Sequence, residues 1–150
     1  EKQLIPLRVM LGLTTVPGNA TAMAKRGVPE AVQYVLNHPM RRTNTCTVSA
    51  EEVQMTALGV LCNLATHREN HALMGDMQGV STLSHILHWT FQHSGAGGVL
   101  TMALRILINL SSSAETHQEM CYSAPLVTAL TRLMRQSPVP AQSNEYVEWE

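Results

Sequence analysis

The histidines are the side chains whose spacing comes closest to a reactive site in this 150-residue sequence. His67 and His71 lie four residues apart, and His85 and His88 lie three apart. On a helix, either spacing places two imidazoles on one face, as zinc ligation requires. However, no cysteine or carboxylate completes an evident third ligand, and the segment from His85 to His93 runs into a loop. We therefore expect surface histidines and no metal site.

Serines and glycines give no catalytic pattern either. The run Ser111-Ser112-Ser113 is typical of a loop that ends a helix, and no GxSxG elbow is present. The glycine-rich segment 95–98 lacks the preceding strand and the following lysine of a phosphate-binding loop. With no acid–base pair or cofactor signature, we expect a protein that is not an enzyme and has no cofactor.

The three cysteines, Cys46, Cys62 and Cys121, form no CxxC pair and are odd in number. This pattern favours free thiols in a reducing compartment, and so an intracellular protein of the cytoplasm or nucleus. We expect Cys62 and Cys121 to be core thiols, because free cysteines are usually buried.

Composition excludes two classes of partner. Ten basic residues face eleven acidic ones, so no basic surface for nucleic acid is expected. The longest apolar stretch, 99–110, spans twelve residues and contains Arg105, too short and too polar to cross a membrane. With 45% apolar residues and only six aromatic ones, aliphatic side chains must form the core.

Three segments of the chain repeat with the period of a helix. They read PLRVMLGLTT from Pro6, ALGVLCNLAT from Ala57 and ALRILINLSS from Ala103, offset by 51 and then 46 residues. Leucines three residues apart form a stripe on the second and third segments. These leucines are Leu58, Leu61, Leu64, Leu104, Leu107 and Leu110.

A second and a third helix follow each of these segments. We expect short helices at 19–25, 70–75 and 116–122, and amphipathic helices at 31–36, 83–87 and 129–134. The turns between them are predicted at Gly27-Val28-Pro29, Gly79-Val80 and Ala124-Pro125-Leu126. Each short helix carries a methionine that we expect in the core: Met23, Met74 and Met120. No segment shows the alternation of a strand.

Longer connections separate the units. The Ser/Thr-rich loop 37–49 contains Arg41-Arg42, a composition that suits regulatory phosphorylation, and ends in a capping box of Ser49 and Glu52. The loop 89–98 is glycine-rich and expected to be flexible. Residues 143–149 start the same helix pattern again, so we expect part of a larger multi-repeat chain or complex. As an alternative, this acidic and aromatic tail is a docking motif.

These motifs resemble the armadillo repeat, the three-helix unit of an α-solenoid. The resemblance rests on the segments 27–36, 52–65, 79–87 and 103–111. It implies an all-α, right-handed superhelical solenoid of about three repeats, with incomplete terminal repeats. The whole chain is then a single domain fragment, with repeat boundaries near 1–26, 27–75, 76–122 and 123–150.

The resemblance also implies a site. In armadillo proteins the third helix of each repeat lines a concave groove, where an asparagine often holds the backbone of an extended peptide. Asn63 and Asn109 match that position. One turn earlier, importin-α-like proteins present tryptophan, whereas this chain has Arg8, Gly59 and Arg105. Without the tryptophan array, binding of nuclear localisation signals is not expected.

The function that follows is a scaffold that binds a protein or peptide partner, an extended or helical segment, in this groove through Asn63, Asn109, Arg105, Gly59 and Arg8. Two alternatives concern single residues: the asparagines bond their own helix ends or a neighbouring loop, and the arginines pair with glutamates of the next helix. A third concerns the whole protein. It is then a structural module that contacts a larger assembly through its convex helices and the loops 37–49 and 89–98.

Overall fold

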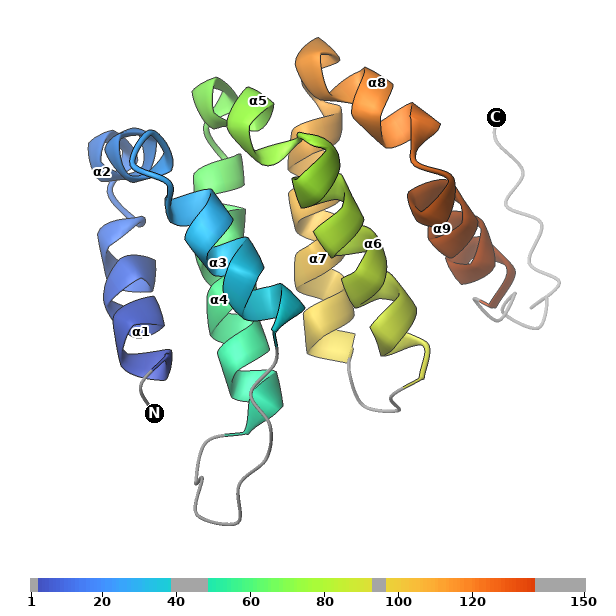
Figure 1. Ribbon diagram of the computed structural model, residues 1–150, viewed down its shortest axis with the longest axis horizontal. Helices are drawn as coiled ribbons and strands as arrows, with labels where there is room; N and C mark the ends of the chain where they lie inside the picture. Colours follow the sequence, from blue (N-terminus) through green and yellow to red (C-terminus); the bar gives the residue numbers. More distant parts are fainter. Residues whose placement is uncertain (1–2, 39–48, 93–96, 137–150) are drawn as a thin grey trace, which may run out of the picture.

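The computed structural model of the chain describes residues 3–38, 49–92 and 97–136. These residues form α-helices joined by short turns, with no strand among them (Figure 1). The predicted repeat of the helix start at 143–149 and most of the Ser/Thr-rich loop lie outside the described residues. The helices are α1 (Leu4–Leu13), α2 (Pro17–Ala24), α3 (Val28–Asn37), α4 (Ala50–Ala65), α5 (His71–Met74), α6 (Met77–Thr90), α7 (Gly97–Ser111), α8 (Ala114–Tyr122) and α9 (Ala124–Gln136), with a 3-10 turn, η1 (Arg68–Asn70), before α5.

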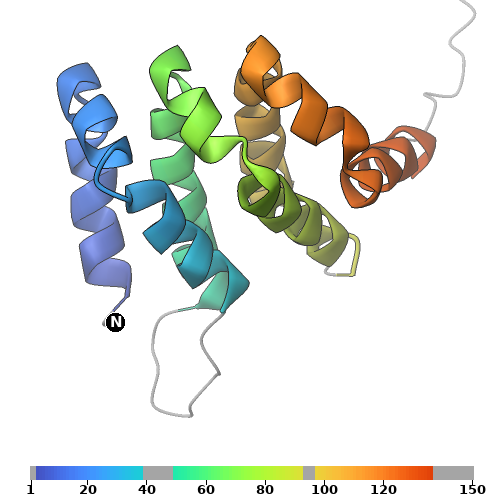
Figure 2. The same ribbon diagram turned by 45° about the horizontal axis from the view of Figure 1, so that its top comes forward.

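The helices stack in two layers. In one layer α4 packs between α1 and α7, and in the other α6 packs between α3 and α9 (Figures 1 and 2). The short helices α2, α5 and α8 close the same end of the stack (Figure 1). The order of short, middle and long helix therefore recurs along the chain, as the sequence predicts, and the all-α fold class is confirmed.

The leucine stripes form the core between these layers. Leu58, Leu64 and Leu110 are fully buried, and Leu61 and Leu107 are nearly so. Leu104, the remaining member, is only partly buried at the edge of the same cluster. Since each helix covers its apolar stripe with the helices next to it, the stack buries one continuous core.

Two of the predicted helix starts have the expected geometry. The Ser49 hydroxyl accepts a hydrogen bond of 3.0 Å from the backbone N–H of Glu52, as half of the predicted capping box. Gly27 is the last residue before α3, and its φ of 81° places its backbone in the left-handed region. A residue with a side chain rarely adopts this conformation, so the glycine is required there.

The turn predicted at Gly79 is wrong. Helix α6 already begins at Met77, and the Asp76 carboxylate caps it by accepting a 2.8 Å hydrogen bond from the N–H of Gly79. Gly79 therefore lies in the first helical turn, where an added Cβ would lie 2.0 Å from the carbonyl oxygen of Met74. A glycine is needed here because the backbone packs closely, and not because the chain turns. The loop predicted over 89–98 is too long at both ends, because Trp89 and Thr90 belong to α6 and Gly97 and Gly98 belong to α7.

The predicted burial of the sulfur-containing side chains is correct only in part. Cys62 and Met74 are buried, as expected. Cys121 is exposed, so its assignment to the core is wrong. Met23 and Met120 are half-buried. The short helix α8 lies at the end of the stack, where one of its faces has no covering helix in the described part of the chain.

A side-chain cap covers the C-terminal end of α4. The Asn70 amide donates a hydrogen bond of 3.0 Å to the carbonyl of Leu64, and the His71 Nε2 donates one of 2.8 Å to the carbonyl of Ala65. Such carbonyls have no partner within their own helix. His71 is buried by these contacts, so its expected place on the surface is wrong.

The same cap recurs at the end of α7, 46 residues later. The Thr116 hydroxyl lies 2.5 Å from the carbonyl oxygen of Leu110, and the His117 Nε2 donates a 2.8 Å bond to the carbonyl of Ser111. In both units the first helix of one repeat thus satisfies the last carbonyls of the long helix before it.

Gly12 is a glycine that the packing of the described residues does not require. Gly12 lies near the end of α1, is exposed, and has no atom within 4 Å of the position of an added Cβ. We expect Gly12→Ala to raise the free energy of unfolding by about 0.5 to 1 kcal/mol, because alanine loses less backbone entropy in a helix. Urea denaturation followed by circular dichroism measures this change. The matched variant Gly27→Ala should instead destabilise by about 1 to 2 kcal/mol, because of its left-handed backbone.

Candidate functional site

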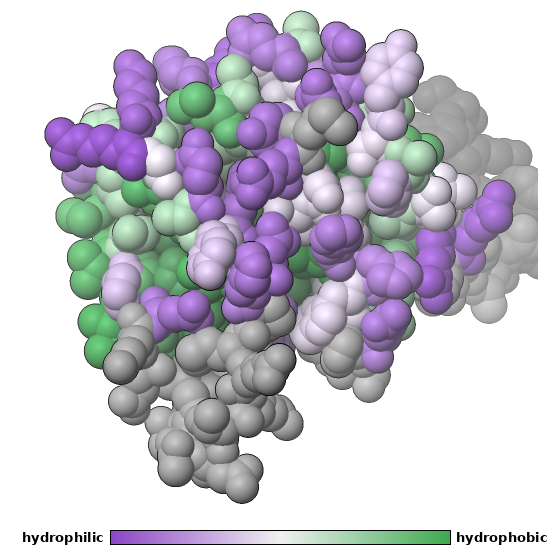
Figure 3. Space-filling model, in the orientation of Figure 1, coloured by the Kyte–Doolittle hydropathy of each residue, from purple (hydrophilic) through white to green (hydrophobic). Residues whose placement is uncertain are grey.

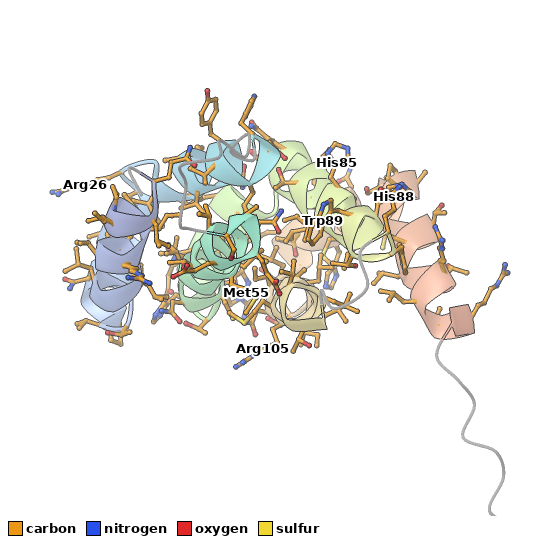
Figure 4. The ribbon with its side chains drawn as sticks, turned by 90° about the horizontal axis from the view of Figure 1, so that it is seen from below. Arg26, Met55, His85, His88, Trp89 and Arg105 are labelled. Atoms are coloured by element: carbon orange, nitrogen blue, oxygen red, sulfur yellow. The ribbon has the colours of Figure 1, made fainter. Side chains whose placement is uncertain are left out.

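The candidate site lies on the surface of the α1, α4 and α7 layer that faces away from α6. In Figure 4, Arg105 projects from α7 on this side, whereas His85 and His88 project from α6 on the opposite side. Met55 of α4 lies toward α7 (Figure 4). We call this surface, with Arg8, Met55, Arg105, Ile108 and Asn109, the inner face.

Helix α7 supplies the main side chains of the inner face. Ile108 and Asn109 follow Arg105 by three and four residues, a spacing that places all three on one side of a helix. Arg105 is exposed, Asn109 is half-buried, and Ile108 is 66% exposed. A cation, an amide and a large apolar side chain therefore lie next to one another, outside the leucine stripe that holds α7 in the core.

The two arginines of the site differ in their pairing. The Arg8 guanidinium lies 2.5 Å from the Glu52 carboxylate, which agrees with the alternative prediction of an ion pair with the next helix. Both side chains are largely exposed, so the pair adds little stability. Arg105 forms no ion pair or hydrogen bond with any described residue. Its positive charge is therefore not compensated by a neighbour in the described part of the chain.

The two asparagines differ in the same way. The Asn63 amide donates a 3.1 Å hydrogen bond to the hydroxyl of Thr14, which itself donates to the carbonyl of Leu11. Asn63 thus ties α4 to the end of α1, in line with the alternative of a bond to a neighbouring loop. The Asn109 side chain forms no hydrogen bond with a described residue, so its donor and acceptor are both unused there.

Gly59 lies beneath the surface and not on it. It is buried, and an added Cβ would lie 3.0 Å from the Cδ1 of Leu11 and 3.8 Å from the Cε of Met102. The close approach that the glycine permits is therefore used by side chains of α1 and α7. Its contribution to the inner face is to let these helices pack tightly on both sides of α4.

Sequence reasoning missed one residue of the inner face. Ile108 is apolar and was read as part of the helical pattern, although it falls outside the leucine stripe of Leu104, Leu107 and Leu110. The signal that would have found it is this position: one residue after Leu107, it lies about 100° around the helix from that buried leucine.

The described residues contain no group of three His, Cys, Asp or Glu side chains that can hold a metal ion. His85 and His88 are both exposed on α6, and His88 Nε2 lies 3.3 Å from the amide nitrogen of Gln92. Within the same residues, no helix combines the length and the hydropathy that crossing a bilayer requires.

Comparisons with known proteins give one match. A family model described as Armadillo-like matches residues 9–137 of the chain, which covers all helices except the first residues of α1. Neither the curated proteins nor the solved structures gave a match.

Proposed function

The chain belongs to the armadillo-like family, and from that premise we propose that it is a non-enzymatic interaction scaffold whose inner face binds an extended or helical segment of a protein partner. Armadillo-like proteins are helical repeat proteins and commonly act as such scaffolds. Their stacked repeats present a long continuous surface, which suits the binding of a chain segment.

One observation carries the proposal: Arg105, which pairs with no residue that the structure describes, lies beside Ile108 and Asn109 on one side of α7. The Asn109 amide offers one donor and one acceptor, which match the C=O and N–H of a peptide unit. Ile108 provides an apolar contact at 66% exposure. A guanidinium binds carboxylates through two parallel hydrogen bonds. The inner face therefore suits a segment with an acidic side chain or a C-terminal carboxylate near an apolar residue.

The other predicted site residues have supporting roles in this proposal. Arg8 and Asn63 extend the inner face toward α1, but each already has a partner, in Glu52 and Thr14 respectively. We expect them to contribute less to binding than Arg105 and Asn109. Gly59 contributes through the packing of Leu11 beneath the surface.

We also propose a reducing, intracellular location in the cytoplasm or nucleus. Cys62 and Cys121 are both free thiols, and Cys121 is exposed. Exposed free thiols are uncommon in oxidising compartments, where they form disulfides.

Selection from a displayed peptide library tests the function. Random peptides with a free C-terminus are selected on the purified chain and then measured by fluorescence anisotropy. We expect enriched peptides with a carboxylate close to an apolar residue, and at least about a tenfold weaker Kd for the variant Arg105→Glu/Asn109→Ala, because a charge-assisted bond contributes about 1.5 to 3 kcal/mol.

The matched control is Arg26→Glu, which makes the same charge change on an exposed residue at the far end of the stack (Figure 4). Circular dichroism first verifies that both variants are as helical as the original chain. If the selected peptides bind the double variant and the control equally well, the inner face is not the binding surface. The proposal would then be wrong, and the convex helices would be the next surface to test.

A further inference from the structure

A hollow of about 320 Å³ lies between α6 and the junction of α8 with α9. Ser81 of α6 lines it, together with Glu119 and Tyr122 of α8 and with Ser123 and Pro125 at the start of α9. These elements lie toward the end of the stack in Figures 1 and 2, and none of them contributes to the inner face. The hollow is therefore separate from the inner face.

The hollow lies at a position where two successive repeats differ in residue type. In the preceding unit Gly79 lets the backbone of Met74 come within 2.0 Å of the place that a Cβ would occupy. In the next unit, 46 residues later, Pro125 stands at that position. Pro125 lines the hollow, whereas Gly79 packs against the backbone of Met74.

The polar groups of the hollow point to a cation. Glu119 is half-buried and forms no ion pair or hydrogen bond with a described residue. A carboxylate without such a partner is available to bind a cation through charge-assisted hydrogen bonds. Ser81 adds a hydroxyl oxygen. The Ser123 hydroxyl oxygen accepts a 3.4 Å hydrogen bond from the backbone N–H of Leu126 and has a second lone pair that can accept another.

The remaining lining suits a long side chain with a planar head. Tyr122 is 82% exposed beside the hollow, and Pro125 forms part of its wall. An arginine places its aliphatic stem on such surfaces, stacks its guanidinium on an aromatic ring and donates two parallel hydrogen bonds to a carboxylate. A lysine offers a point charge without the planar fit.

We propose that this hollow is a second binding site, which takes up an arginine side chain of a protein partner with Glu119 as its counterion. Ser81 and Ser123 accept the remaining guanidinium hydrogen bonds, and Tyr122 covers the stem. The site does not depend on the inner face, because the two surfaces share no residue. A partner that contacts both would bind across the edge of the stack with an affinity greater than either contact provides.

The test uses N-acetyl-arginine amide as the probe and its neutral isostere N-acetyl-citrulline amide as the comparison. Each is titrated into the ¹⁵N-labelled chain, and amide chemical shifts are recorded. We expect saturable shifts for residues 80–81, 122–124 and 126 with the arginine probe, at a Kd in the millimolar range typical of a single side chain. The citrulline probe should bind at least about fivefold more weakly, because it lacks the charge.

Two variants make the result specific. Glu119→Gln removes the charge at constant shape and should weaken the arginine probe at least about fivefold. Glu69→Gln, an exposed glutamate of η1, is the matched control and should leave the Kd unchanged. Ser81→Phe fills the hollow from its exposed side and should abolish the localised shifts, which keeps the test valid if Glu119→Gln proves unstable.

Three outcomes would overturn the proposal: scattered or unsaturable shifts, equal binding of arginine and citrulline, or equal binding by Glu119→Gln and the original chain. None of them bears on the inner face, because the peptides selected for that surface are measured separately on Arg105→Glu/Asn109→Ala. Failure of one proposal is thereby distinguished from failure of the other.

Discussion

Gly79→Ala should lower the free energy of unfolding by about 3 kcal/mol or more, the largest effect that we expect from the addition of one methyl group. The new Cβ would lie 2.0 Å from the carbonyl oxygen of Met74 and 3.0 Å from its carbonyl carbon. These are backbone atoms at the end of α5, so no side-chain rotation relieves the contact. The intrinsic gain of about 1 kcal/mol from alanine in a helix is too small to offset it. Thermal unfolding followed by circular dichroism should show a midpoint lower by roughly 10 °C.

Gly59→Ala is the matched control for this prediction. It also places a methyl group at a buried glycine inside a long helix, but its nearest neighbour is the Cδ1 of Leu11 at 3.0 Å. A side-chain end can shift by a few tenths of an ångström, so the intrinsic gain of about 1 kcal/mol roughly offsets the crowding. We expect a change within about 1 kcal/mol. If Gly79→Ala were as stable as Gly59→Ala, then α5 and α6 would not pack as described.

Leu110→Ala should cost about 3 to 5 kcal/mol, because it removes a fully buried side chain and leaves a cavity. Leu110 lies in α7, which packs against both α4 and α6. Loss of its side chain therefore weakens both layers at once. The change is measured by urea denaturation. If the free energy of unfolding falls with urea concentration at the same slope in both proteins, the surface exposed on unfolding is the same.

Ile108→Ala is the comparison on the same helix. Because Ile108 is 66% exposed, its truncation should change stability by no more than about 0.5 kcal/mol. The same variant should weaken binding of the selected peptides, since Ile108 belongs to the proposed inner face. A stability loss at Ile108 as large as that at Leu110 would show that Ile108 is packed, and the proposed inner face would lose its apolar contact.

The fold was predictable because its signals repeat. The leucine stripes at 58–64 and 104–110 and the 46-residue offset between them indicate stacked helices before any contact is known. The cap at Ser49 was also found, because it needs only a hydroxyl and the N–H three residues later. Such features depend on residues that are close in sequence, where side-chain type determines local geometry.

The errors in the prediction arise where distant residues determine the outcome. Gly79 has the residue type of a turn, but the glycine is required by the approach of Met74. His71 has the residue type of a surface group, but the free carbonyl of Ala65 binds and buries it. Cys121 lies in an apolar pattern, yet no helix of the described part covers it.

The positions of the candidate site were predictable from the sequence, but which of its side chains already have partners was not. The repeat pattern places Asn63 and Asn109 at equivalent points, as it does Arg8 and Arg105. Only the structure shows that Thr14 binds Asn63 and that Glu52 binds Arg8, which leaves the members on α7 free of described partners. Pairing between residues 44 and 49 positions apart has no local signal in the sequence.

The caps on α4 and α7 have a consequence for the way the molecule opens. The last carbonyls of α4 depend on Asn70 and His71, and those of α7 depend on Thr116 and His117. When the short helix of one repeat detaches, the long helix before it loses these bonds and frays from its end. The groups of residues that open together in the native state therefore include parts of two successive repeats. Amide hydrogens at the end of each long helix should exchange with solvent together with those of the short helix that follows it.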